Sequence, residues 1–226
     1  MAVSTPTTCG HNTPASGLAT TVALTLTAAV PAGAKFIGKV GWNGSTTISG
    51  ISCPELSATG GTLNTIATNG TNHVQGVYLD APYGIANGTV ITVTFSASSD
   101  SRHFAGNYVT GAAAGIGSSS QTATGTTNAW STTAILSTST GLIYSGAYLA
   151  IDSSNTATSP NVELIEQTIA TDSGSVDEYA PGDGNNITPA GAWASGSAGW
   201  CACACLISAG MVALNNQVLW RLGVFF

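Results

Sequence analysis

The sequence predicts an all-β protein, an antiparallel β-sandwich of about eight to ten strands in the jelly-roll or immunoglobulin-like style. Charged residues are only 6% of the 226-residue chain, against about 25% in ordinary soluble domains. Thr, Ser, Ala and Gly supply much of the rest, whereas long exposed helices rely on Glu, Lys and Arg. Hydrophobic content of 43% is ample for a buried core.

The chain divides into three parts by composition. Residues 1–16 contain Pro6 and Pro14 without periodicity, which predicts an extended N-terminal arm. Residues 17–209 carry the strand signals and form the predicted sandwich domain. Residues 210–226 are strongly apolar and form a separate C-terminal segment.

Strand signals begin at residues 21–27, where polar and apolar side chains alternate. The turn 31–34 leads into a second strand, in which Lys35 and Lys39 lie on the face opposite Phe36. Residues 89–96 give the strongest strand pattern of the chain. We therefore expect paired strands in this half.

The second half continues in the same way. Further strands are predicted at 73–80, 102–110, 134–136, 142–151, 162–170 and 192–207. The run 111–128 has almost no large side chains, so we expect a long loop or a thin edge segment. Strand centres about ten to fifteen residues apart favour an antiparallel sandwich over alternating strands and helices.

Five cysteines are an odd number, so at least one thiol stays free. Cys201, Cys203 and Cys205 recur with the period of a strand, which places their sulfurs on one face and alanines on the other. Neighbours at this spacing lie about 6.5 Å apart, which disfavours disulfides among them. We expect a buried strand that uses Cys as a small hydrophobe. A soft-metal thiolate site is the alternative, but no histidine lies nearby in the sequence.

The charge pattern excludes several partners. The only cations are Lys35, Lys39, Arg102 and Arg221, which are too scattered to bind a phosphate backbone, so nucleic acid is not expected. No apolar run approaches the ~18 residues of a membrane-spanning helix, so no membrane partner is predicted. Residues 22–34 resemble a signal-peptide core, but no Lys or Arg precedes them, and we expect strands and no export.

No convincing catalytic set is present, so the sequence predicts neither an enzyme nor a cofactor. Glu163 and Glu166 are a candidate glycosidase pair, but a strand places residues three apart on opposite faces. Asp100, Arg102 and His103 imitate a hydrolase constellation without a nucleophile-elbow motif. We expect His103 to be a hydrogen-bonded residue on a strand face.

Two binding sites remain candidates. The loop 172–186 places Asp177, Glu178 and Asp183 among Gly and Asn, which suits calcium, with a solvated acidic loop as the alternative. Trp130 adjoins the small-residue run and is the best candidate for an exposed aromatic platform that stacks on sugars. A position in the core is the alternative for Trp130.

The C-terminal run 218–226 ends without a polar tail. Chain ends are usually solvated unless they are tied down, so this end is expected to be buried. We predict assembly contacts from Trp220, Leu222, Phe225 and Phe226. The alternative is a closing strand of the same sandwich.

Several segments resemble β-sandwich modules of tailed-bacteriophage virion proteins. They are 27–42, with the turn Pro31-Ala32-Gly33-Ala34; 87–96, which begins Asn-Gly-Thr; 108–112; and 194–200, before the cysteine strand. The likeness spans roughly residues 20 to 209 and lies in pattern rather than in a specific motif. The three cysteines and the apolar tail from Met211 depart from it and leave the type of virion protein open.

The resemblance implies a structural component located in the virion. A head decoration (cement) protein or head fibre that self-associates or coats the capsid is the expected type. Its partners would be the major capsid protein or further copies of the chain in a homo-oligomer. A tail-fibre, receptor-binding or carbohydrate-binding domain is the alternative, followed by a glycan-active enzyme.

Overall fold

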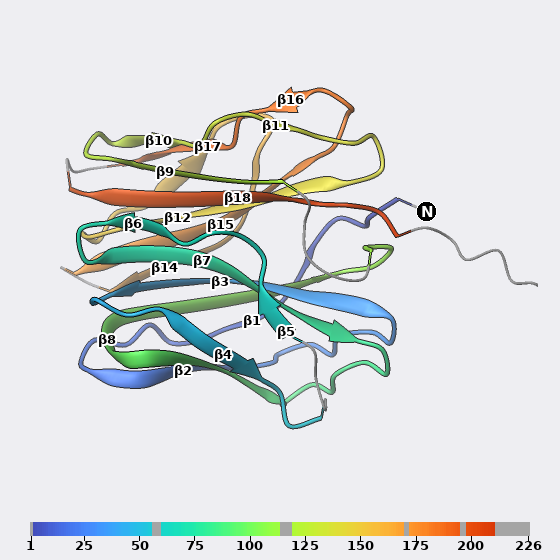
Figure 1. The fold of residues 1–226 in the computed structure, drawn as a ribbon, viewed down its shortest axis with the longest axis horizontal. Helices are drawn as coiled ribbons and strands as arrows, with labels where there is room; N and C mark the ends of the chain where they lie inside the picture. The colour runs from blue at the N-terminus through green and yellow to red at the C-terminus, as the bar shows by residue number, and fades with distance from the viewer. Residues whose placement is uncertain (1, 56–59, 114–118, 170–171, 195–197, 211–226) are drawn as a thin grey trace, which may run out of the picture.

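The computed structural model describes residues 2–55, 60–113, 119–169, 172–194 and 198–210. These residues form eighteen strands and no helix (Figure 1). The predicted all-β, antiparallel, sandwich-like fold is therefore confirmed, with more strands than the eight to ten expected because several are only two or three residues long. In the described part of the chain, no helix is long and apolar enough to span a membrane.

The larger sheet has eight strands and is built around the longest one. Its members are β1 (Thr7–His11), β2 (Ala19–Thr25), β3 (Ala34–Asn43), β4 (Ile48–Ser52), β5 (Gly60–Thr62), β6 (Ala67–Asn69), β7 (Asn72–Ala81) and β8 (Val90–Val109). The main order is β1-β8-β3-β7-β5, while β2 and β4 pair with β8 and β6 pairs with β7. All these pairings are antiparallel.

Strand β8 belongs to two layers at once. Its first half pairs with β2 and β4, and its second half pairs with β1 and β3. Between the halves, Ser101 adopts a left-handed φ of 47°, and its N–H donates to Asp100 Oδ1 at 2.7 Å. The sheet therefore folds over itself. Leu24, Phe95 and Phe104 are among the side chains enclosed between its two halves.

The second large sheet has five antiparallel strands in the order β14-β15-β12-β18-β9. Its strands are β9 (Ser120–Gly125), β12 (Leu142–Leu149), β14 (Val162–Ile169), β15 (Ser173–Pro181) and β18 (Trp200–Ile207). The expected small-residue edge segment within 111–128 corresponds to β9, which pairs with β18 alone in this sheet.

Short strands cover the outer face of the five-stranded sheet (Figure 1). They are β10 (Ala129–Ser131), β11 (Ile135–Leu136), β13 (Asn155–Ala157), β16 (Asn186–Ile187) and β17 (Ala190–Trp193). The order β10-β17-β13 forms one small sheet, and β11 pairs with β16. Trp130 and Trp193 pack here against Ala202 and Val176.

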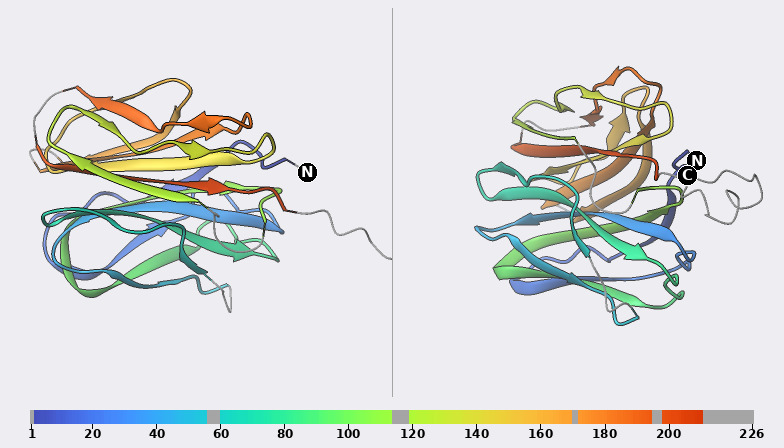
Figure 2. Two further views of the ribbon diagram at one scale, coloured as in Figure 1. Left: turned by 45° about the horizontal axis from the view of Figure 1, so that its top comes forward. Right: turned by 45° about the vertical axis from the view of Figure 1, so that its right-hand side comes forward.

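The five-stranded sheet lies between the larger sheet and the short strands, as Figure 2 shows from two directions. Every residue of β12 and of β18 is buried. The inner face of this sheet meets β3, β7 and β8, and the outer face meets the short strands. This double burial encloses the side chains that lie between the two large sheets.

The N-terminal segment differs from the extended arm that the sequence predicts. Thr7–His11 pairs with β8 as strand β1, and Cys9 is fully buried in the adjoining core. The prolines at 6 and 14 flank this strand instead of interrupting it, which is where an edge strand tolerates them.

Candidate functional site

The interior between the two large sheets contains polar and ionisable side chains. We call Lys39, Asn107, Tyr144, Asp177 and Cys203 the inter-sheet network. Lys39 and Asn107 come from neighbouring strands β3 and β8, and the other three come from β12, β15 and β18 of the facing sheet. None is more than 4% exposed.

Asp177 accepts hydrogen bonds from both sheets. Tyr144 Oη donates to Asp177 Oδ2 at 2.6 Å, and Asn107 Nδ2 donates to the same oxygen at 3.3 Å and to Tyr144 Oη at 3.2 Å. Thr8 Oγ1 on β1 completes the set by donating to Asn107 Oδ1 at 3.0 Å. Burial raises the pKa of Asp177 to about 7, although these bonds and the charge of Lys39 act in the opposite direction.

Lys39 reaches across to the cysteine strand. Its Nζ lies 3.2 Å from Cys203 Sγ, 3.4 Å from Cys203 O and 4.8 Å from the Tyr144 ring centroid. Burial by itself lowers the pKa of Lys39, but the nearby Cys203, Cys205 and Asp177 outweigh burial and raise it. The lysine amine, a thiol and a carboxyl group thus share one buried interior.

His103 forms a second polar contact between the sheets. Its two ring nitrogens lie 2.8 Å from Ser173 Oγ and 3.0 Å from Ser175 Oγ, and Tyr148 packs edge-on at 5.5 Å. Burial lowers the pKa of His103 to about 3, so the ring is neutral at physiological pH. The expectation of a hydrogen-bonded strand-face histidine is confirmed.

The hydrolase-like constellation is not assembled. Arg102 donates to the backbone carbonyls of Ser99 and Gly17, and Asp100 accepts from backbone N–H groups. Neither side chain is hydrogen-bonded to His103. The three residues share a strand but serve different contacts.

Three carboxylates gather around Asn155 on the outer face of the five-stranded sheet. Asn155 Nδ2 donates to Glu178 Oε1 at 2.8 Å and to Glu163 Oε2 at 3.1 Å, and the Asn155 N–H donates to Glu166 Oε1 at 2.9 Å. Burial raises the pKa of Glu178 to about 8 and, to a smaller extent, raises that of Glu166. A buried Glu178 whose charge is disfavoured and whose oxygen accepts from the Asn155 amide is a structural arrangement.

The expectation that Glu163 and Glu166 lie on opposite faces is therefore wrong. The register of β14 shifts between Glu163 and Ile165, which indicates a β-bulge. A bulge adds one residue and reverses the alternation beyond it. Both glutamates consequently reach Asn155.

The segment 172–186, a calcium candidate with a solvated acidic loop as the alternative, is not an open loop, because most of it forms strand β15. Asp177 and Glu178 lie within β15 and point into different interiors, while Asp183 lies beyond that strand in a turn. Alternation along a strand separates the first two carboxylates. No group of metal-ligating side chains that could hold an ion is found in the described part of the chain.

Trp130 does not provide an exposed platform. It is 1% exposed, and its Nε1 donates to Asn155 Oδ1 at 2.9 Å. The short strand β10 turns it inward against the five-stranded sheet, so the core alternative is correct. The predicted assembly residues Trp220, Leu222, Phe225 and Phe226 lie outside the described residues.

The prediction of a buried cysteine strand without disulfides is confirmed. All five thiols are free and buried, and Cys203 and Cys205 face β3 while Ala202 and Ala204 face the short strands. The sequence did not reveal that Lys39 is the partner of Cys203. The available signal was that Lys39 stands in a strand whose two faces both carry apolar or small residues, which is typical of a sheet buried on both sides.

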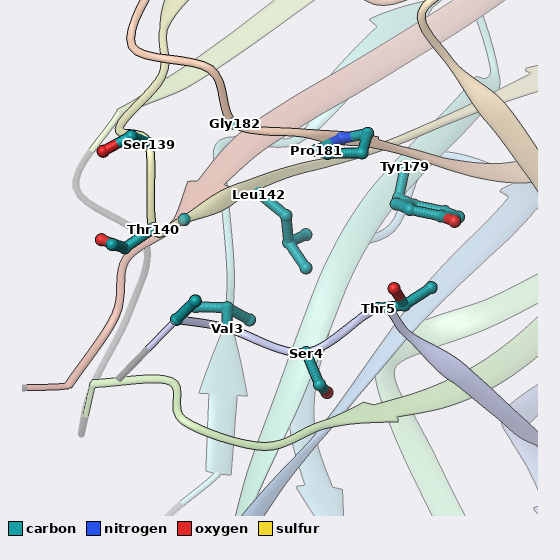
Figure 3. A pocket seen from close by; sticks show the side chains of 11 residues that line it. Val3, Ser4, Thr5, Ser139, Thr140, Leu142, Tyr179, Pro181 and Gly182 are labelled. Atoms are coloured by element: carbon teal, nitrogen blue, oxygen red, sulfur yellow. The ribbon is translucent and has the colours of Figure 1, made fainter.

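Two hollows lie away from these polar groups. One, of about 130 Å³, lies between the N-terminal residues and the start of β12, where Val3, Thr5, Leu142, Tyr179 and Pro181 are among its lining (Figure 3). It is smaller than typical ligand pockets of ~300 Å³ or more. The other, of about 330 Å³, is lined by small residues and the Lys35–Asp80 ion pair.

The chain matches no protein-family model, no curated protein and no solved structure.

Proposed function

We propose that this chain is a structural component of a virion, of the head decoration (cement) or head-fibre type. The observation that carries the proposal is that buried polar side chains form contacts between the two large sheets. Contacts such as Asn107 to Asp177 and Lys39 to Cys203 join strands 70 and 164 residues apart. Such ties favour a rigid body, which a particle component requires.

The sparse surface charge supports a chain that is covered by neighbours. Only fourteen charged residues are present, four basic and ten acidic, and the edge strand β9 carries none. An edge strand without charge is a template for pairing with another chain. Leu136 and Val162 are large apolar residues left 63% and 45% exposed. These features fit self-association or contact with a capsid protein.

The carbohydrate-binding alternative loses the residue on which it rested. Trp130 is enclosed by the fold and bonded to Asn155, so its ring faces are not available to a sugar. Lys39, His103, Asp177 and Glu178 are likewise buried and hydrogen-bonded within the fold. A non-enzymatic structural role is the proposal that fits these positions.

The test is to look for the polypeptide in purified particles. Quantitative mass spectrometry of phage from an infected culture should find it at a fixed, repeated copy number, and antibody-labelled electron microscopy should place it on the head. Labelling of tail fibres alone would replace the head assignment with the fibre alternative. Particles that lack the polypeptide altogether would reject the virion role.

A further inference from the structure

The contact between Lys39 and Cys203 joins two reactive groups from different sheets. The Nζ to Sγ distance is 3.2 Å, and the residues are 4% and 0% exposed. The sequence separation is 164 residues, so this single contact connects the first part of the chain to its last described strand. The proposed virion role does not explain why these two groups lie together.

The surroundings hold the amine in this position. Gly146 lies beneath the Lys39 side chain, and a Cβ added there would approach Lys39 Cγ to 3.1 Å and Cδ to 3.3 Å. The Tyr144 ring lies on another side, 4.8 Å from Nζ. Fixed proximity of this kind replaces a bimolecular encounter with an intramolecular one.

We propose that Lys39 and Cys203 form a covalent nitrogen–oxygen–sulfur bridge between the two sheets. The oxidant is dioxygen, which is small and apolar enough to enter a protein interior. The Lys39 ammonium group first releases a proton to solvent. One N–H bond of the resulting amine and the S–H bond of the thiol then break, and N–O and O–S bonds form. One oxygen atom becomes the bridge. The other leaves as water with the two hydrogens, so nitrogen and sulfur each lose two electrons and dioxygen gains four.

The geometry favours this bridge over other links in the same interior. Lys39 Nζ has its hydrogen bonds to Cys203, whereas Asn107 and Asp177 bond to each other and to Tyr144. An amide between Lys39 and Asn107 therefore requires the lysine to leave its partner. Disulfides within the cysteine strand are opposed by the spacing of about 6.5 Å between same-face neighbours.

The first experiment measures the intact mass of the full chain, purified in air without reductant and then unfolded and alkylated. The bridge adds one oxygen and removes two hydrogens, a gain of about 14 Da, and protects Cys203 from alkylation. One thiol fewer than the five present should therefore be labelled. Treatment with a phosphine reductant should restore the sequence mass and the fifth label, and a cross-linked peptide pair should contain Lys39 and Cys203.

The second experiment assigns the bridge to one thiol. Cys203→Ser should abolish the mass gain, while the matched variant Cys205→Ser, from the same strand face, should keep it. The wild-type measurements decide the matter even if one variant fails to fold.

Other results would overturn the proposal. They are an unchanged mass with five labelled thiols after prolonged aeration, or a loss of about 2 Da from a disulfide or a direct sulfur–nitrogen bond. A loss of about 17 Da that resists reductant would assign an amide from Lys39 to Asn107 instead. Absence of the polypeptide from particles would reject the virion role and leave this result unaffected.

Discussion

Replacing Gly41 with alanine tests whether the two large sheets are in direct contact. Gly41 lies in β3, and an added Cβ would come within 2.5 Å of Tyr148 Cδ2 and 3.2 Å of its Cγ on the facing sheet. Tyr148 has little freedom to yield, because it is fully buried, packs against His103 and donates from Oη to Ser101 O at 3.3 Å.

The size of the clash sets the loss of unfolding free energy expected for Gly41→Ala. Carbon atoms prefer a separation of about 3.5 Å or more, so the overlap is about 1 Å. Overpacking of this kind costs about 1–3 kcal/mol of unfolding free energy. For a chain of this size, each kcal/mol corresponds to about 2–4 °C in melting temperature. We therefore expect Gly41→Ala to melt several degrees below wild type.

Gly50→Ala is the matched control. Gly50 also lies in a strand, β4, but no atom lies within 4 Å of its added Cβ. Urea titrations followed by tryptophan fluorescence should show little change for this variant and a lower midpoint for Gly41→Ala. Equal midpoints for the two variants would refute the packing of Tyr148 against β3.

Three further predictions concern the buried polar groups. Because burial raises the pKa of Asp177 from its ordinary 3.8 to about 7, the stability from its protonated form is present at low pH and lost as the pH rises from about 4 to 7. Asp177→Asn should flatten that part of the curve of unfolding free energy against pH, and an unchanged slope would contradict the assignment. The pKa of His103 lies near 3, so its imidazole NMR signals should not titrate between pH 8 and 5 in the folded chain; a midpoint near 6.5 would show that the ring is solvated. Asn155→Ala leaves Glu178 and the Trp130 N–H without their partner and should cost about 1–3 kcal/mol, measured by urea titration. Asn185→Ala, in an exposed turn, should stay within about 0.5 kcal/mol of wild type, and equal losses in the two variants would contradict the buried role of Asn155.

The sequence predicts the fold class well because strand periodicity is a local property. The alternation of residues 89–96 and the period of the three cysteines both appear as expected in β8 and β18. Periodicity separates the two faces of a strand, but it does not tell whether the second face meets water or another sheet. Lys39 lies opposite Phe36 as predicted, yet that face is covered by the five-stranded sheet.

The positions of Glu163 and Glu166, of the calcium candidates and of Trp130 depart from what local sequence suggested for one physical reason. A bulge in β14 brings Glu163 to the side-chain amide of Asn155 and Glu166 to its backbone N–H. The strand geometry of β15 separates Asp177 from Glu178. Trp130 follows a run of small residues, but a covering strand turns it inward. In each case tertiary pairing between distant strands decides where a polar or aromatic side chain lies, and local composition carries no record of that pairing.

The sharing of β8 between two layers has a consequence for synthesis. Strands β2, β3 and β4 all hydrogen-bond to β8, which begins only at residue 90. At roughly 5–20 residues per second, the ribosome delivers β8 several seconds after β2. During that interval the early strands have no native partner along β8 and expose unpaired edges. A ribosome-bound chaperone that shields this stretch should therefore raise the yield of folded chain more than one that acts after release.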